Sequence, residues 1–252
     1  MPARPRRPPP TTLAAAALLG VAAVVIVLPG CSLFVMGGKM LFGDPATTPA
    51  FEEVTGVDLT DGGRPVLILA DSPESVKIRF PELDQELVRL TGRKLRAEGV
   101  KVVRSDEVLD WVEARGGVWD EATLPDIAQE FDDVDFIVTV ALDRFTWHEH
   151  ASPDLLKGRA AGRIRAYEVI RPAADPLAEV AELVDLSDDT EAPDARPICS
   201  CVMPGDFSTE YPKHGPEQAG NISEKLFRKK FLDRLCTQTA QRFVPHHARD
   251  TL

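Results

Sequence analysis

Three short apolar segments, separated by helical patterns, constrain the fold of this chain most. Residues 66–70 (Val-Leu-Ile-Leu-Ala) are continuously apolar, and residues 134–142 form a second run that is nearly all apolar. Runs of this length without alternation are typical of strands that are buried on both faces. Residues 100–103 (Val-Lys-Val-Val) predict a shorter strand between them.

The segments between these strands have the spacing of amphipathic helices. Four leucines from Leu83 to Leu95 recur at helical spacing, and Gly99 stands where a helix often ends in the left-handed conformation. Two shorter helices are expected after Ser105 and Thr123, because both residue types are favourable N-caps. The order strand, helix, strand, helices, strand predicts parallel pairing with right-handed crossovers.

The second half of the chain has a different pattern. Extended runs at 163–170 and 178–186, joined by a segment with two prolines, predict an antiparallel pair. Residues 187–215 are acidic and then interrupted by prolines, so we expect a loop with a short strand at 198–203. The longest helix is expected over about 216–243. We therefore predict an α/β fold, a three-layer-like mixed sheet with a parallel βαβαβ first half, an antiparallel pair and a long C-terminal helix.

The N-terminus has the features of an export signal. Arg4, Arg6 and Arg7 give it a positive start, no acidic residue precedes Asp44, and residues 13–28 are uncharged. A basic end, a short apolar stretch and a small-residue cleavage site together describe a secretory signal peptide.

The residues that follow this apolar stretch, Leu28-Pro29-Gly30-Cys31, resemble the lipobox of bacterial lipoproteins. The resemblance implies cleavage before Cys31 and attachment of lipid to its thiol. A membrane-spanning helix needs about 20 apolar residues, a length that is reached only by reading through Pro29 and Gly30. An uncleaved N-terminal anchor is the alternative, and both interpretations place the folded part outside the cytoplasm, in the periplasm or another extracytoplasmic space.

The expected organisation has four parts: a signal peptide (1–30), a lipidated N-terminus and flexible tether (31–64), one α/β domain (65–245) and a tail (246–252). The chain carries a formal net charge of −11. Removal of the three signal arginines would take this to −14. Such a balance argues against a nucleic-acid partner and against direct adhesion to anionic lipid.

The order of elements also resembles a group of exported α/β domains: the curli-secretion lipoprotein, the lipoprotein activators of penicillin-binding proteins and the Tol N-terminal domain. The matching segments are 66–69, 99–103, 135–140, 165–169 and the helix expected from Pro216. The resemblance implies an exported α/β lipoprotein domain. Pore formation is not implied, because no long alternating hairpin beyond 163–186 is present for a membrane barrel.

Two segments contain candidate ligand-binding groups, one for a metal and one for a phosphate. His148 and His150 would share one face of a strand and, with Asp154, could hold a metal, but we interpret them as a polar strand end. Residues 158–162 (Gly-Arg-Ala-Ala-Gly) lack the pattern of a phosphate-binding loop and are expected to form a turn. We expect no metal, no cofactor and no catalytic residue.

Three cysteines remain if Cys31 is lipidated: Cys199, Cys201 and Cys236. An exported chain can form disulfides, so Cys236 could pair with either of the other two, or no disulfide forms. A zinc site that also uses His214 has no common spacing and is not expected.

The leading hypothesis is a non-catalytic, membrane-anchored envelope lipoprotein that binds another envelope protein or itself. Among the aromatic residues near predicted loops, Trp147 is our choice for an interface residue. One alternative is a small-ligand-binding domain or enzyme whose site lies at the carboxyl ends of the strands. The groups expected there are Asp71, Ser72, Arg104, Ser105 and Asp143. A second alternative is a subunit of a secretion-type oligomer.

Overall fold

The computed structural model describes residues 46–117, 119–150, 152–172 and 196–247. The expected signal peptide, the lipobox with Cys31 and the extended run at 178–186 lie outside the described residues. The main compact unit spans Thr48–His246. Two-residue strands β1 (Ala46–Thr47) and β7 (His246–His247) form a small sheet of their own.

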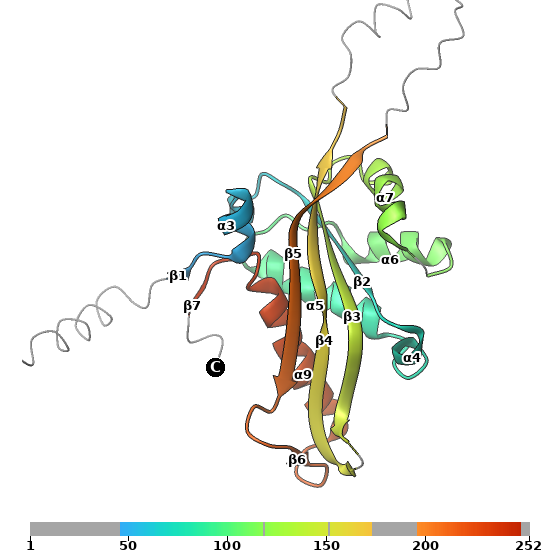
Figure 1. The fold of residues 1–252 in the computed structure, drawn as a ribbon, viewed down its shortest axis with the longest axis vertical. Helices are drawn as coiled ribbons and strands as arrows, with labels where there is room; N and C mark the ends of the chain where they lie inside the picture. Colours follow the sequence, from blue (N-terminus) through green and yellow to red (C-terminus); the bar gives the residue numbers. More distant parts are fainter. Residues whose placement is uncertain (1–45, 118, 151, 173–195, 248–252) are drawn as a thin grey trace, which may run out of the picture. The chain divides into compact units, whose positions relative to one another are not determined.

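Among the described residues, a five-stranded mixed sheet forms the centre of this unit (Figure 1). Its strands are β2 (Val66–Asp71), β3 (Phe136–Glu149), β4 (Ser152–Ile170), β5 (Ile198–Tyr211) and β6 (Glu217–Gln218). The order is β2-β3-β4-β5, with β6 also paired to β4. Among the described strands of this sheet, only β2 and β3 pair in parallel; β4 pairs antiparallel with β3, β5 and β6.

Helices cover both faces of the sheet, which confirms the three-layer α/β expectation. They are α3 (Ala50–Thr55), α4 (Glu74–Lys77), α5 (Leu83–Ala97), α6 (Ser105–Ala114), α7 (Leu124–Glu130) and α9 (Glu224–Ala240), with 3-10 turns η1 (Leu59–Asp61) and η2 (Glu121–Thr123). Side chains of α3, α5 and α9 share one hydrophobic cluster, and those of α6 and α7 share another.

Strand β2 is continuously apolar because alternate residues enter these two clusters. Val66 and Ile68 pack with α5 and α9, whereas Leu67 and Leu69 pack with α6 and α7. Successive side chains of a strand point to opposite faces, so a strand between two helical layers has no polar position. The same reasoning holds for the first half of β3, which starts opposite Val66 at Phe136.

The strand expected at 100–103 is not formed. Val102 makes an isolated parallel bridge with Val66, in which the Val66 amide donates to Lys101 and the Val103 amide donates to Val66. The segment is confined between Gly99, whose φ is +92°, and α6, which begins at Ser105. Too few residues lie between Gly99 and α6 to form a strand with several ladder partners. Among the described strands of the sheet, parallel pairing is therefore limited to β2 and β3.

The second half of the sheet also differs from the expectation. The run at 163–170 is the end of the 19-residue strand β4, whose ladder partners are β3 and β5. Residues 158–162, expected to be a turn, lie inside β4. The short strand expected at 198–203 continues to Tyr211 as β5, and the loop expected there is correspondingly shorter. β5 includes Pro204, which its position at the edge of the sheet allows.

The C-terminal helix begins later than the expected Pro216. Ser223 caps α9 by accepting a hydrogen bond from the Leu226 amide at 3.3 Å. Residues 217–218 instead form β6 beside β4. The helical period alone could not locate this start, because a side-chain cap decided it.

The folded unit begins earlier than the expected Arg64. Phe51 in α3 is fully buried, with its ring 5.1 Å from that of Phe136 and 5.7 Å from that of Phe243. The Phe51 amide donates to the Arg242 carbonyl at 2.9 Å. Leu59 in η1 is buried as well, so residues 50–61 belong to the core rather than to a tether.

Candidate functional site

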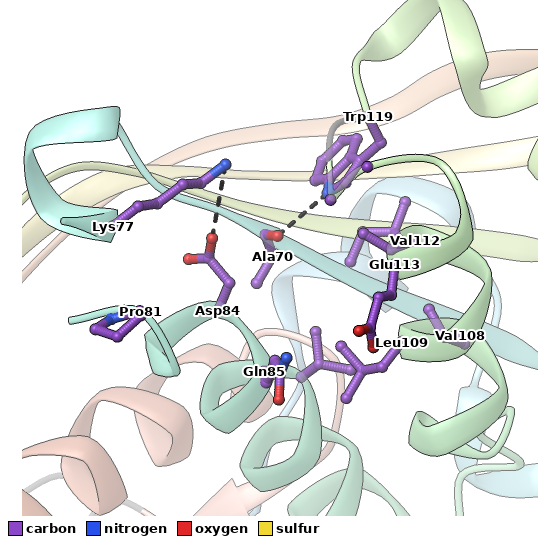
Figure 2. Close-up of a pocket in the computed structure, with 14 residues that line it drawn as sticks. Ala70, Lys77, Pro81, Asp84, Gln85, Val108, Leu109, Val112, Glu113 and Trp119 are labelled. Carbon is purple, nitrogen blue, oxygen red and sulfur yellow. Dashed lines mark hydrogen bonds and ion pairs between the residues drawn. The ribbon is translucent and has the colours of Figure 1, made fainter.

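A cleft of about 450 Å³ opens at the carboxyl end of β2 (Figure 2). It lies between the segment that carries α4 and the start of α5 on one side and α6 on the other. Its apolar lining is contributed mainly by Ala70, Pro81, Val108, Leu109, Val112 and Trp119. Cavities of this size and composition are common ligand sites in α/β folds, especially outside the carboxyl ends of strands.

One end of the cleft is polar because β2 ends there. Asp71 is the last residue of β2, and Pro73 stops the strand before the single turn α4 brings Lys77 back over it. The Lys77 ammonium donates to Asp71 Oδ1 at 2.7 Å and lies 3.9 Å from Asp84 Oδ2. The Ser72 hydroxyl donates to Asp84 Oδ1.

Burial and charge act in opposite directions in this polar group. Burial raises the pKa of Asp84 above its ordinary value, although the Ser72 hydrogen bond and Lys77 oppose the change. Burial would lower the pKa of Lys77, but the hydrogen bond and the charge of Asp71, together with Asp84, raise it. The lysine is therefore held in its charged form between two carboxyl groups.

Trp119 lines the cleft on the side opposite Lys77 (Figure 2). Its indole nitrogen donates to the Ala70 carbonyl at 3.2 Å, which attaches the ring to the end of β2. The cleft thus combines a fixed aromatic ring, an aliphatic wall and a charged end. Such a surface suits a ligand that is mainly apolar and has one polar group.

The polar group of the cleft does not have the geometry of a nucleophilic site. Ser72 is 3% exposed and its hydroxyl donates to a carboxylate, so it is not positioned to attack a bound substrate. Among the described residues, no histidine lines the cleft. The arrangement can bind a ligand through apolar contact and through the charges of Asp71, Lys77 and Asp84.

The structure brings together only part of the expected strand-end set. Asp71 and Ser72 lie next to the cleft, where they form hydrogen bonds with the lining residues Lys77 and Asp84, but Arg104 and Ser105 are elsewhere. Val102 bridges Val66 at the beginning of β2, so the residues that follow Val102 start α6 far from the end of β2. The Ser105 hydroxyl instead accepts a hydrogen bond from Arg96 at 3.0 Å.

Asp143 is also outside the cleft, because β3 does not end at residue 142. The strand continues to Glu149, and Asp143 forms a 3.6 Å ion pair with Arg163 of β4. Sequence reasoning missed Lys77, Asp84 and Trp119. Asp84 has the pattern of an ordinary acidic residue in the first turn of a helix, and α4 is too short to show a period.

Trp147, the expected interface residue, lies on β3 and is partly buried. Its indole nitrogen donates to Glu224 Oε1 at 2.7 Å, and its ring lies 4.1 Å from that of Phe80 and 5.8 Å from that of Phe145. These contacts join β3 to α9. A role at an interface stays a prediction for this residue.

Among the described residues, no group of three or more His, Cys, Asp or Glu side chains is arranged to hold a metal. His148 belongs to β3, whereas His150 follows its last residue. The three described cysteines are free thiols. Cys199 packs against the hydrophobic cluster of α6 and α7, whereas Cys236 belongs to the cluster of α3, α5 and α9. These two cysteines therefore lie on opposite faces of the sheet. Burial raises the pKa of Cys236 to about 12.

No protein-family model and no curated protein matches the sequence. Several solved structures are similar to this chain at low sequence identity. A PelC dodecamer from Paraburkholderia phytofirmans matches 80% of this chain and 98% of its own, at 7% identity and a TM-score of 0.35. The comparison with lipoprotein GNA1162 from Neisseria meningitidis covers 70% of this chain and 98% of that chain, at 12% identity and a TM-score of 0.36. The comparison with the hypothetical protein CT253 from Chlamydia trachomatis covers 71% of this chain and 96% of that chain, at 11% identity and a TM-score of 0.40.

At these identities and TM-scores, the similarity transfers neither an assembly state nor a residue's role to this chain. The narrower resemblance to the curli-secretion, penicillin-binding-protein-activator and Tol group stays a prediction. Within the described ranges, no helix has the length and apolar character needed to span a bilayer.

Proposed function

We propose that this chain is an exported, lipid-anchored envelope protein whose folded unit binds a partner protein without catalysis. The proposal joins the lipobox-like Leu28-Pro29-Gly30-Cys31 to the cleft at the end of β2. A domain attached to a membrane raises its effective concentration toward partners in the same compartment.

The observation that carries the binding function is the composition of the cleft. Its walls are mainly apolar. The hydroxyl of Ser72, which follows β2, is buried and donates its hydrogen bond to Asp84. The cleft can therefore bury apolar side chains, and burial of apolar surface is worth about 25 cal/mol per Å².

The charges around the cleft favour a partner segment with a basic group. The cleft is lined by two carboxyl groups, those of Asp84 and Glu113, and by one ammonium, that of Lys77, which is also paired with Asp71. Three carboxyl groups against one ammonium leave a local negative charge. A segment that presents an aliphatic or aromatic side chain next to a lysine, an arginine or an amino terminus complements it.

The volume of the cleft supports a second candidate, a small-ligand site. About 450 Å³ lies within the roughly 300–1,000 Å³ of small-molecule pockets. Thermal shift of the purified protein with a panel of small amphipathic amines distinguishes the two: a shift that Leu109→Arg removes supports the small ligand.

Anchoring is tested by the substitution Cys31→Ala. We expect it to abolish metabolic fatty-acid labelling and to release the protein from the membrane fraction. Labelling that persists in this variant would overturn the lipobox interpretation.

Partner binding is tested by a photo-crosslinking amino acid at Gln85, which lines the cleft, with Glu82 as the matched control. Both positions are exposed and lie at the start of α5, but Glu82 is not part of the lining. We expect one envelope protein to be captured from Gln85 alone and to be lost on addition of Leu109→Arg. Equal capture from both positions, or capture that survives Leu109→Arg, would contradict the proposal.

A further inference from the structure

A second concave surface lies on the side of α5 and α9 that faces away from the sheet. The hollow has a volume of about 780 Å³ and is lined by residues of both helices, together with Ser223. Two ion pairs hold the helices together across it: Arg228 with Glu86 and Lys94 with Asp233, both at 2.6 Å. We call this surface the α5–α9 groove.

The α5–α9 groove is strongly basic on an acidic chain. Its basic residues are Arg89, Arg93, Lys94, Lys225, Arg228 and Lys229. Its acidic residues are Glu86 and Asp233. Six basic residues against two acidic residues give the groove a local charge of +4, whereas the whole chain has −11.

Three of these basic residues are exposed and without an ion pair among the described residues. Glu86 and Asp233 pair with Arg228 and Lys94, which leaves Arg93, Lys225 and Lys229 facing solvent from the two helices. Because structural pairing does not use these three charges, they are available to a ligand.

The positive field continues beyond the groove toward the start of α6. A neighbouring hollow of about 400 Å³ shares Arg89 and Arg93 with the groove and adds Arg96 and Arg104. Its acidic member, Asp106, lies 3.7 Å from Arg89. A ligand in the groove would therefore meet further basic residues past one end.

The floor of the groove is apolar. Leu90 and Leu232 line it, and Leu226 is a large apolar side chain that is 45% exposed at the start of α9. An apolar floor between basic rims fits an amphipathic segment whose apolar side chains enter the groove and whose acidic side chains reach the rims.

We infer that the α5–α9 groove binds an acidic amphipathic segment of a protein partner. The occupant follows from charge complementarity, since a +4 surface on an acidic chain attracts acidic segments and repels basic ones. A concave floor favours a segment over a bilayer, because a flat surface would touch the rims and leave the leucines uncovered. The groove is separate from the cleft at β2, so this inference does not depend on the binding proposed there.

The first test measures binding of a fluorescein-labelled peptide of about 18 residues, built from Glu, Leu and Ala with leucines at helical spacing. Fluorescence anisotropy should show saturable binding to the folded unit that weakens with added salt. The same peptide with lysine in place of glutamate should not bind. Absence of saturable binding by the acidic peptide overturns the inference.

Charge reversal locates the site. Arg93→Glu with Lys229→Glu changes the groove from six basic and two acidic residues to four of each, and we expect at least about a tenfold loss of affinity. The matched control is Arg79→Glu with Lys230→Glu, which makes the same change of net charge at exposed residues outside the groove. An equal loss in both double variants overturns a specific site.

Leu226→Gln tests the apolar floor without changing charge. The substitution should weaken binding of the acidic peptide. It should leave the circular dichroism spectrum and the unfolding midpoint of the protein near those of the parent. Two further results would overturn the inference in favour of another occupant. One is binding to phosphatidylglycerol vesicles in preference to the peptide; the other is self-association that the Arg93→Glu, Lys229→Glu variant abolishes.

Discussion

Gly158 of β4 lies directly against Phe231 of α9. A Cβ atom at this position would lie 2.6 Å from Cγ of Phe231, whose ring is fully buried. We predict that Gly158→Ala lowers the free energy of unfolding by about 1–3 kcal/mol, because the ring has no free space to move into. Urea unfolding followed by circular dichroism measures the change.

Gly63→Ala is the control for this substitution. A Cβ atom there meets nothing within 4 Å, and the residue is exposed. Its effect on stability should be within about 0.5 kcal/mol. Equal stability of the two variants would show that α9 does not press on β4 at residue 158.

Asp84 makes stability depend on pH. Burial raises its pKa in the folded state, so between the ordinary and the raised value the folded state binds the proton more tightly than the unfolded chain. The contribution of this carboxyl group is therefore full below its ordinary pKa and is lost as pH rises through the raised value. Asp84→Asn removes that loss.

The measurement is the free energy of unfolding of both proteins from about pH 3.5 to pH 7. Stability of the Asn variant relative to the parent should rise with pH over this interval. A constant difference would mean that folding does not shift the pKa of Asp84. A difference that falls with pH would mean that Lys77 and Ser72 outweigh burial and hold the pKa below its ordinary value.

Helix α9 depends on a cap at its start. Ser223 accepts a hydrogen bond from the Leu226 amide, one of the amides that have no partner within the helix. We predict that Ser223→Ala costs about 1 kcal/mol of stability. Ser75→Ala, at an exposed serine inside α4, is the control and should change stability little; a Ser223→Ala effect no larger than the control's would argue against the cap.

Elements that a local pattern specifies were predicted correctly. The apolar run at 66–70, the leucine spacing of α5 and the left-handed Gly99 were each read from neighbouring residues, and each is confirmed. Elements that depend on residues far away in the sequence were not predicted correctly. The failed strand at 100–103 and the full length of β5 are set by what lies beside them in the sheet, which no local period records.

The candidate site was less predictable than the fold for the same reason. Asp71 and Ser72 follow an apolar strand, so their place at its end could be predicted. Lys77 and Asp84 join them only because α4 is a single turn that folds back over the strand end. Trp119 reaches the same place from beyond α6.

The boundaries of the whole unit give a further prediction. Phe51 is fully buried against Phe136 and Phe243, and Leu59 is buried nearby. A chain that begins at Arg64 should be less stable than one that begins at Thr48, by about 3–5 kcal/mol for the loss of Phe51 alone. Urea unfolding of the two chains measures the difference, and equal stability would mean that residues 48–63 are a tether after all.

Net charge describes the whole molecule poorly. The total of −11 argues against anionic partners, yet the α5–α9 groove carries +4 and the cleft at β2 is locally negative. Two surfaces of opposite sign on one unit can select two different partners. The total charge is informative for solubility and for long-range repulsion, but not for what each surface recognises.

The distance along the chain between α5 and α9 has a consequence for synthesis. Phe227, Phe231 and Leu235 of α9 cover the same cluster that Leu83 and Leu87 of α5 enter. A ribosome makes α5 well over a hundred residues before it completes α9, so nascent chains carry an uncovered apolar face for most of elongation. Such a chain cannot complete its core until α9 has been made, and its exposed apolar surface makes the partly made chain prone to aggregation.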